Sequence, residues 1–130
     1  MHLPFLYARF HKQHHEFHST VAISSEYLSV VEEITTGVIP TLCGPLFLKA
    51  HMGVIILWVA IRVAESADAH CGYALPWSVF AWGRPGDRHD YHHSQNDGNF
   101  GAFFTFWDWV CGTDKKYRAY LLKKKLSKVF

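Results

Sequence analysis

Two histidine triplets with the same spacing are the residues of this chain best suited to chemistry. They are His11, His14 and His15 in HKQHH, and His89, His92 and His93 in HDYHH. On a helix each residue advances by about 100°, so side chains at positions i, i+3 and i+4 gather on one face. Histidines clustered at ligand spacing are typical of a metal site. We therefore expect each triplet to point its imidazoles in one direction, and the two triplets to bind metal together.

The number of histidines indicates two metal ions rather than one. A structural zinc site needs four ligands and favours cysteine, whereas at least seven of the 10 histidines lie in polar segments. Adjacent members such as His14 and His15 diverge by about 100°, which suits them to different ions or to different positions around one. Imidazole suits Zn, Cu, Fe and Ni. We interpret His18 and His51, which stand outside the triplets, as structural.

Further candidate site residues lie close to these histidines. His70 stands in the polar segment AESADAHCGYALP. A carboxylate that accepts the free ring N–H of a ligating imidazole fixes its orientation. Candidates for that role are Glu16, Glu26, Asp68 and Asp90. The alternative for each of them is an ordinary solvated acid.

A nitrogen-rich metal site in a hydrophobic protein points to oxygen chemistry on a lipid, because metals can attack an unactivated C–H bond and side chains cannot. Two-iron sites of the ferritin type use glutamates and Glu-x-x-His instead. Metal-assisted hydrolysis of a lipid is the competing enzyme class.

Composition narrows the class of protein. The 130 residues match one domain, 49% hydrophobic and 16% aromatic, with a net charge of only +2. Lysines gather in a basic tail at 115–130, which is either a solvated tail or, in a membrane protein, a mark of the cytoplasmic side. No groove-reading or base-stacking element accompanies that charge, so no nucleic-acid partner is expected. Three widely spaced cysteines indicate a reducing compartment rather than a disulfide framework.

The elements that must position the histidines are predicted to be all-α. Residues 2–18 are expected to be helical or semi-helical, and 19–33 amphipathic. Residues 34–64 are apolar and interrupted at Gly37, Pro40, Gly44 and Pro45. If both triplets share a site, the chain between them must leave and return on one side, since one crossing would separate them by about 30 Å. We therefore expect a membrane helical hairpin with its turn near 48–51; a water-soluble core hairpin is the alternative.

Two segments beyond the hairpin have their own predictions. Residues 77–87 are expected to form a loop, and 96–99 a turn. The aromatic run at 103–109 either walls an apolar pocket, lies at a membrane interface or belongs to the core.

Five stretches of the chain carry a resemblance to a known family. They are HKQHHEF at 11–17, SSEY at 24–27, IRVAESADAHCGYALPWS at 61–78, RHDYHHSQNDGNFG at 88–101 and FWDWVCGTDKKYR at 106–118. In this order they resemble the sterol desaturase and fatty acid hydroxylase superfamily, and within it the C-4 methylsterol monooxygenases. The resemblance implies a two-iron enzyme of the endoplasmic reticulum membrane with its metal site facing the cytosol. It also implies dioxygen, and electrons passed from NAD(P)H through a reductase and a small haem carrier, for oxidation of a sterol C-4 methyl group.

The resemblance also assigns ligands and boundaries. The triplets match the second and third histidine boxes of the family, and His70 matches the histidine of its AHCGY segment. His2 matches the second histidine of the first box, HxxxH, whose first histidine would lie upstream of Met1. We therefore expect residues 1–130 to be the C-terminal part of such a domain, truncated at its N-terminus.

Two departures from the family pattern define the other hypotheses. Ser29 stands where the family has the histidine of EYAHP, and STVA at 19–22 replaces APFG. A second hypothesis is therefore an inactive relative that keeps a structural metal or binds a partner. A third is fatty acid hydroxylation or ring desaturation within the same superfamily, because the boxes define the oxidant and not the substrate.

Overall fold

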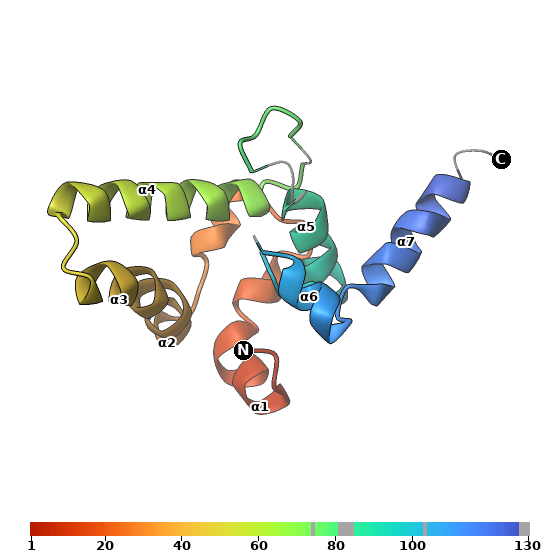
Figure 1. The fold of residues 1–130 in the computed structure, drawn as a ribbon. Coiled ribbons are helices and arrows are strands. Elements are labelled where there is room, and N and C mark those ends of the chain that lie inside the picture. Colours follow the sequence, from red (N-terminus) through yellow and green to blue (C-terminus); the bar gives the residue numbers. More distant parts are fainter. Residues whose placement is uncertain (74, 81–84, 103, 128–130) are drawn as a thin grey trace.

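Helical segments make up all the regular structure of the part of the chain that is described, which confirms the all-α prediction (Figure 1). The computed structural model describes residues 1–73, 75–80, 85–102 and 104–127. The α-helices are α1 (Pro4–Leu6), α2 (Val30–Glu32), α3 (Ile39–Phe47), α4 (Met52–Ala69), α5 (Pro85–Gln95), α6 (Phe106–Cys111) and α7 (Lys115–Leu126). Other helical turns are the π-helices η1 (Tyr7–His11) and η4 (Glu33–Val38), and the 3₁₀ turns η2 (His14–Glu16) and η3 (Ala22–Glu26).

The first histidine triplet lies on an irregular helix. Within the predicted helical or semi-helical stretch 2–18, residues 4–11 and 14–16 are helical, passing from α1 through the wide turn η1 to the tight turn η2. Pro4 opens it, where a missing backbone N–H costs nothing. His11 ends the π-helical part, and His14 and His15 begin the 3₁₀ part. Such mid-helix changes often mark functional positions.

The apolar segment forms a helical hairpin with its turn where it was predicted, while its place in a membrane stays a prediction. Its first arm is one continuous helical stretch through α2, η4 and α3, and its second arm is α4. At the turn, Lys49 has a φ of 51°, and the ring of His51 caps α4 by accepting a hydrogen bond from the Gly53 N–H. The Trp58 indole donates to the carbonyl of Thr41 at 2.8 Å and links the arms. His51 is thus structural, as predicted.

The first arm stays helical through the glycines and prolines that interrupt its apolar sequence. The π-helical turn η4 contains Gly37, and Pro40 and Pro45 lie within α3. A π-helical turn re-spaces the backbone hydrogen bonds, so the helix can continue past prolines that cannot donate. The second arm also runs five residues past the predicted end at Ala64, to Ala69. This extension carries His70 to the centre of the molecule.

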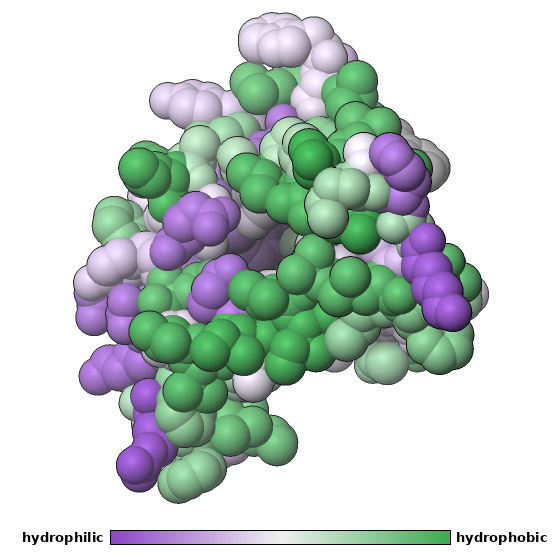
Figure 2. All heavy atoms as spheres, turned by 90° about the vertical axis from the view of Figure 1, so that its left-hand side faces the viewer, coloured by the Kyte–Doolittle hydropathy of each residue, from purple (hydrophilic) through white to green (hydrophobic). Residues whose placement is uncertain are grey.

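Large apolar side chains cover the outside of the hairpin (Figure 2). Phe47, Leu48, Met52 and Leu57 are all more than 60% exposed. Figure 2 also shows a hollow between apolar walls on this face. None of the described helices combines the length and the apolar character that crossing a membrane requires.

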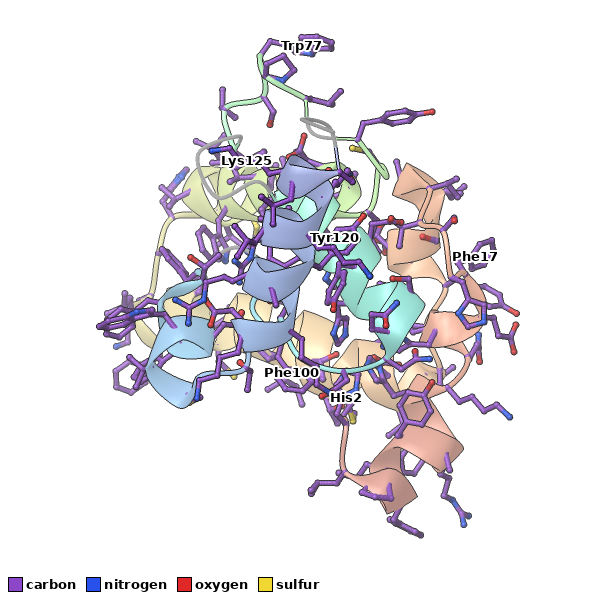
Figure 3. All side chains as sticks on the ribbon, turned by 90° about the vertical axis from the view of Figure 1, so that its right-hand side faces the viewer. His2, Phe17, Trp77, Phe100, Tyr120 and Lys125 are labelled. Carbon is purple, nitrogen blue, oxygen red and sulfur yellow. The ribbon has the colours of Figure 1, made fainter. Side chains whose placement is uncertain are left out.

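In the second half of the chain one sequence prediction needs correction, one is confirmed and one alternative is excluded. Helix α5 begins at Pro85, so the predicted loop at 77–87 ends earlier; residues 81–84 of that loop lie outside the described residues. The turn at 96–99 is confirmed by positive φ angles at Asn96, Gly98 and Asn99. The described part of the aromatic run, 104–109, is not core, since Phe104, Trp107 and Trp109 are each more than 60% exposed; residue 103 lies outside the described residues. Figure 3 shows Trp77 at the outer end of its loop, far from His2 and Phe100.

The buried interior is polar rather than apolar. Among the described residues, Ala69 and Tyr117 are the only buried hydrophobic side chains. The buried polar side chains include seven imidazoles, those of His11, His14, His15, His70, His89, His92 and His93. The helices therefore pack around histidines, and the apolar residues lie outside. His18, by contrast, is exposed.

Candidate metal centre

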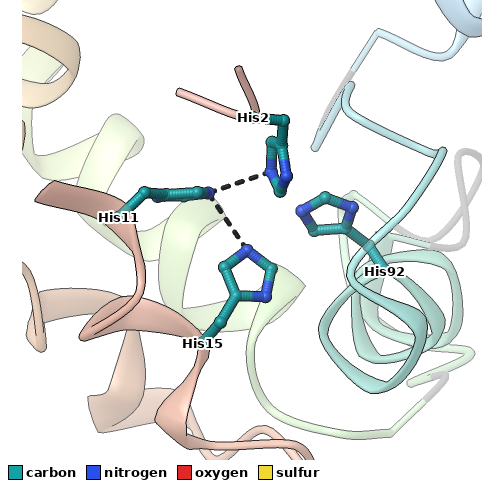
Figure 4. Close-up of side chains that lie close together, drawn as sticks. All are labelled: His2, His11, His15 and His92. Carbon is teal, nitrogen blue, oxygen red and sulfur yellow. Dashed lines mark hydrogen bonds between the residues drawn. The ribbon is translucent and has the colours of Figure 1, made fainter. Parts of the chain in front are cut away.

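The eight histidines named from the sequence lie together in two groups of four. The first histidine group is His2, His11, His15 and His92, and the second histidine group is His14, His70, His89 and His93. Within each group one nitrogen from every ring lies within 4.8 Å of the others. Figure 4 shows the first group, with four rings from three chain segments converging on a common centre.

The two triplets contribute to both groups in a crossed pattern. His11 and His15 enter the first group while His14 enters the second; His89 and His93 enter the second group while His92 enters the first. Neighbouring histidines thus diverge, as predicted from their angular spacing. One remote residue completes each group, His2 in the first and His70 in the second.

The spacing of the ring nitrogens suits a common ion. In the first group, the Nε2 atom of His11 lies 2.9 Å from that of His2 and 3.0 Å from that of His15. In the second group, the Nε2 atom of His70 lies 3.2 Å from that of His14 and 2.9 Å from that of His89. Imidazole binds metal at about 2.0–2.1 Å, which places two ligands on one ion about 2.9–3.4 Å apart.

Hydrogen bonds at the far side of three rings leave their Nε2 lone pairs free for a metal. The Nδ1–H of His70 donates to the carbonyl of Ser66 at 2.8 Å, and that of His92 to the carbonyl of Gly98 at 2.6 Å. The Nδ1–H of His11 donates to the Glu32 carboxylate. A neutral imidazole has one N–H, so Nε2 of each ring carries a lone pair. In the metal-free chain such a lone pair accepts a hydrogen bond from a neighbouring ring that carries its proton on Nε2, and a bound cation would take the place of that hydrogen bond.

Seven of the eight imidazoles have a lowered pKa, which favours the neutral form that metal binding requires. Burial, followed by the neighbouring His70 and His11, lowers the pKa of His14 from 6.5 to about 3. Burial and the nearby His92 have the same effect on the pKa of His2, which falls to about 3. Burial also depresses the pKa of His89 strongly. Protons therefore do not compete for these nitrogens at neutral pH.

Gly72 allows His70 to reach the triplets. It has a φ of +73°, and a Cβ atom there would lie 2.7 Å from the carbonyl oxygen of Thr20. Only glycine accepts both this backbone conformation and this contact. The backbone and hydroxyl of Thr20 also donate to the carboxylate of Asp90 on α5. The segments bearing His14, His70 and His89 are thereby held together.

The carboxylates predicted to orient imidazoles are bonded elsewhere. Asp90 accepts from Thr20, and Glu16 accepts from the Tyr27 hydroxyl at 3.1 Å. Glu26 accepts from Ser25. Burial lowers the pKa of His70, and the charge of Glu26 only partly opposes that shift. For Asp68, the hydrogen bonds given involve its backbone carbonyl. None of these four carboxylates is hydrogen-bonded to an imidazole among the described residues.

Sequence reasoning missed Glu32, which contacts His11 directly. Glu32 is 3% exposed and comes from α2, 21 residues along the chain. The Ser29 hydroxyl caps α2 by accepting from the Glu32 backbone N–H at 3.2 Å. Ser29 therefore has a structural role, and both four-histidine groups form without a side chain from that position. The only sequence signal was the position of Glu32 in an amphipathic segment.

Two cavities reach the histidine groups. One of about 340 Å³ runs from His14, His70 and His89 to Val38, Leu42, Val59 and Val63 on the hairpin. Another of about 560 Å³ lies beside His2, His11, His92 and Phe100. Glu32, Thr36, His14 and His89 line both. The first cavity thus joins an apolar end to the histidines and has the size of a small-molecule pocket.

Comparison with known proteins identifies relatives for this arrangement. The fatty acid hydroxylase family model matches residues 1–113. Methylsterol monooxygenase 2-2 of Arabidopsis thaliana is 38% identical over 125 residues, covering 91% of this chain and 46% of the relative. Methylsterol monooxygenase 1-3 of the same plant is 38% identical over 133 residues, covering 97% and 44%. A very-long-chain aldehyde decarbonylase of Oryza sativa subsp. indica is 37% identical over 125 residues, covering 91% and 46%. The chain spans about half the length of these relatives, and no solved structure matches it.

Proposed function

Because the chain belongs to the fatty acid hydroxylase family, we propose that it carries the metal centre of a two-iron oxygenase that acts on a lipid. The observation that carries the proposal is the division of eight histidines into two groups of four with converging ring nitrogens. The donor set fits iron, since imidazole is a suitable ligand for it. His2, His11, His15 and His92 would hold one ion, and His14, His70, His89 and His93 the other.

Iron bound there would activate dioxygen for attack on a C–H bond, which no side chain can perform. The chain itself supplies the neutral imidazoles, their orientation and the exclusion of water. His11, His70 and His92 are oriented by Glu32, Ser66 and Gly98. The cavity between α3 and α4 would hold the apolar body of the substrate with its reacting carbon toward His70 and His89.

For the substrate we propose a sterol intermediate whose C-4 methyl group is oxidised. Two methylsterol monooxygenases among the relatives support this choice. The name of the decarbonylase relative shows that similar chains are assigned other lipid substrates. Fatty acid hydroxylation or ring desaturation is therefore the alternative within the family. The monooxygenase names favour oxidation over metal-assisted hydrolysis.

We further propose that the protein works at the endoplasmic reticulum membrane with its metal centre facing the cytosol. The exposed apolar side chains of the hairpin and of α6 suit a lipid surface. Lysines on α7 suit the cytosolic side; residues 128–130 of the basic tail lie outside the described residues. Electrons would come from NAD(P)H through a haem carrier protein.

Metal analysis and turnover of the full chain test this function. We expect two irons per chain, and conversion of a 4-methylsterol in the presence of dioxygen and an electron source. His92→Ala should remove one ligand of the first histidine group and abolish turnover. His51→Ala, which alters only the cap of α4, should preserve the iron content and the turnover. A wild-type chain with one ion or none would refute the two-iron proposal. Two irons in a chain that turns over no lipid would instead support an inactive relative with structural metal.

A further inference from the structure

Asp108 organises the segment that contacts His92, although it touches no histidine itself. This carboxylate on α6 is 2% exposed and accepts four hydrogen bonds. Its donors are the backbone N–H of Phe100 at 2.9 Å, the backbone N–H of Gly101 at 3.0 Å, the Thr113 hydroxyl at 2.6 Å and the Arg88 guanidinium at 3.4 Å. A buried carboxylate bonded on both oxygens fixes the groups around it.

The segment held in this way delivers two groups to the first histidine group. The carbonyl of Gly98 accepts the Nδ1–H of His92 at 2.6 Å. The ring of Phe100 lies with its centroid 4.8 Å from that of His2 and 5.6 Å from that of His92. Figure 3 shows His2 and Phe100 next to each other. Asp108 thus fixes the backbone of the segment that makes these contacts, by accepting from the N–H groups of Phe100 and Gly101.

Thr113 closes the arrangement from the other side. Its carbonyl accepts the Asn99 N–H at 3.3 Å, and a Cβ atom on Gly98 would lie only 2.4 Å from the same carbonyl oxygen. Gly98 has a φ of +70°, a backbone conformation that favours glycine. Together with the close Thr113 carbonyl, this means that position 98 could not carry a side chain. The turns at 96–101 and 112–114 therefore interlock around Asp108.

We propose that Asp108 is a positioning residue for His92. Through the backbone of 98–101 it holds the Gly98 carbonyl where His92 must keep its proton on Nδ1 and direct its Nε2 lone pair into the first histidine group. The inference rests on the proposed metal centre, but its effect on His92 exists in the metal-free chain as well. It gives the FWDWVCGTD segment a role that the histidine boxes do not explain.

The test compares Asp108→Asn with a matched control. Asp97→Asn makes the same change within the 96–101 turn itself, at an exposed carboxylate that is bonded to the exposed Lys116. In the metal-free full chain, long-range ¹H–¹⁵N spectra report which ring nitrogen carries the proton. We expect Asp108→Asn to remove the fixed Nδ1–H form of His92, because the amide group cannot accept all four bonds. Asp97→Asn should leave it intact.

His70 serves as the internal control, since its Nδ1–H donates to Ser66 on α4. A general loss of structure would change His70 as much as His92, and that result would overturn a specific role for Asp108. An unchanged His92 in Asp108→Asn would overturn it too. If Asp108→Asn does not fold, Thr113→Val removes a single one of the four bonds and decides the question by the same spectra.

Metal titration separates this inference from the proposed function. With Co²⁺ as the probe, Asp108→Asn should weaken the first histidine group about 10- to 100-fold and leave the second group unchanged. Equal weakening of both groups, or of neither, would contradict the inference. A wild-type chain that binds no Co²⁺ would refute the proposed metal centre, whereas the spectra would still decide whether Asp108 positions His92.

Discussion

Replacing Glu32 by alanine should weaken metal binding at the first histidine group and leave the second group intact. The substitution leaves the Nδ1–H of His11 buried without its acceptor. His11 could then move its proton to Nε2 or rotate, and either change removes a ligand from the group. Glu32 is 3% exposed, so water would not easily replace the lost carboxylate.

The magnitude follows from the lost hydrogen bond. A hydrogen bond to a charged acceptor contributes about 1.5–3 kcal/mol, which is a factor of about 10–150 in an equilibrium constant. Loss of a partner that orients a metal ligand typically costs about 10- to 100-fold in affinity. The loss of affinity expected from the hydrogen bond therefore agrees with the loss typical of an orienting partner. The free energy of unfolding of the metal-free chain should change less, because Glu32 Oε2 has no partner among the described residues and alanine also removes that buried, unpaired oxygen.

Co²⁺ titration of the full chain, with a competing chelator, measures the affinity of each group. Glu16→Ala is the matched control, since it removes a carboxylate that is bonded to Tyr27 and not to an imidazole. Glu32→Gln keeps an amide oxygen that can accept from His11 and should retain most of the affinity. If Glu32→Ala and Glu16→Ala bind Co²⁺ equally well at both groups, the orienting role of Glu32 is refuted.

Two further predictions concern the cavity and the effect of pH. Val59→Trp places a large ring in the cavity of about 340 Å³ between the hairpin arms; binding of a 4-methylsterol should weaken while the metal content stays the same, and unchanged sterol binding would show that the substrate lies elsewhere. The metal-free chain should lose stability as the pH falls from about 6.5 toward 3. The reason is that the folded pKa of His14 lies near 3 and that of the unfolded chain near 6.5, so only the unfolded state binds the proton in this range. Urea unfolding should show a loss of about 1.4 kcal/mol per pH unit for each such histidine, and a flat profile would contradict the buried neutral histidines.

The histidine groups were largely predictable because the signal is local. Spacing within HKQHH and HDYHH determines which rings share a face, and it correctly separated His14 from His15. His70 was recognisable from its polar segment. His2 was placed only by its resemblance to a family box, since its own neighbours carry no pattern.

The groups that orient the histidines were not predictable, because their contacts depend on the path of the backbone. Glu32 meets His11 across 21 residues, from a helix whose start is set by the Ser29 cap. Two of the three acceptors that fix a ring proton at Nδ1 are backbone carbonyls, those of Ser66 and Gly98. Every residue has a carbonyl, so side-chain identity could not point to these two. The predicted carboxylates were chosen for closeness in sequence, which says little about direction in an irregular helix.

The inverted polarity of the molecule links its folding to its proposed metals. Ala69 and Tyr117 are the only buried hydrophobic side chains among the described residues, so little apolar surface in this interior drives the helices together. Burying imidazoles is unfavourable unless their nitrogens are paired. The buried rings meet one another through Nε2, but the Nδ1 atoms of His14, His15, His89 and His93 have no partner among the described residues. Ions bound by both groups would turn these contacts into ligand bonds and add their binding free energy to folding. The exposed apolar faces of the hairpin and α6 would be stabilised by contact with lipid. On this reasoning the same histidines that would carry the chemistry also take the place of a hydrophobic core.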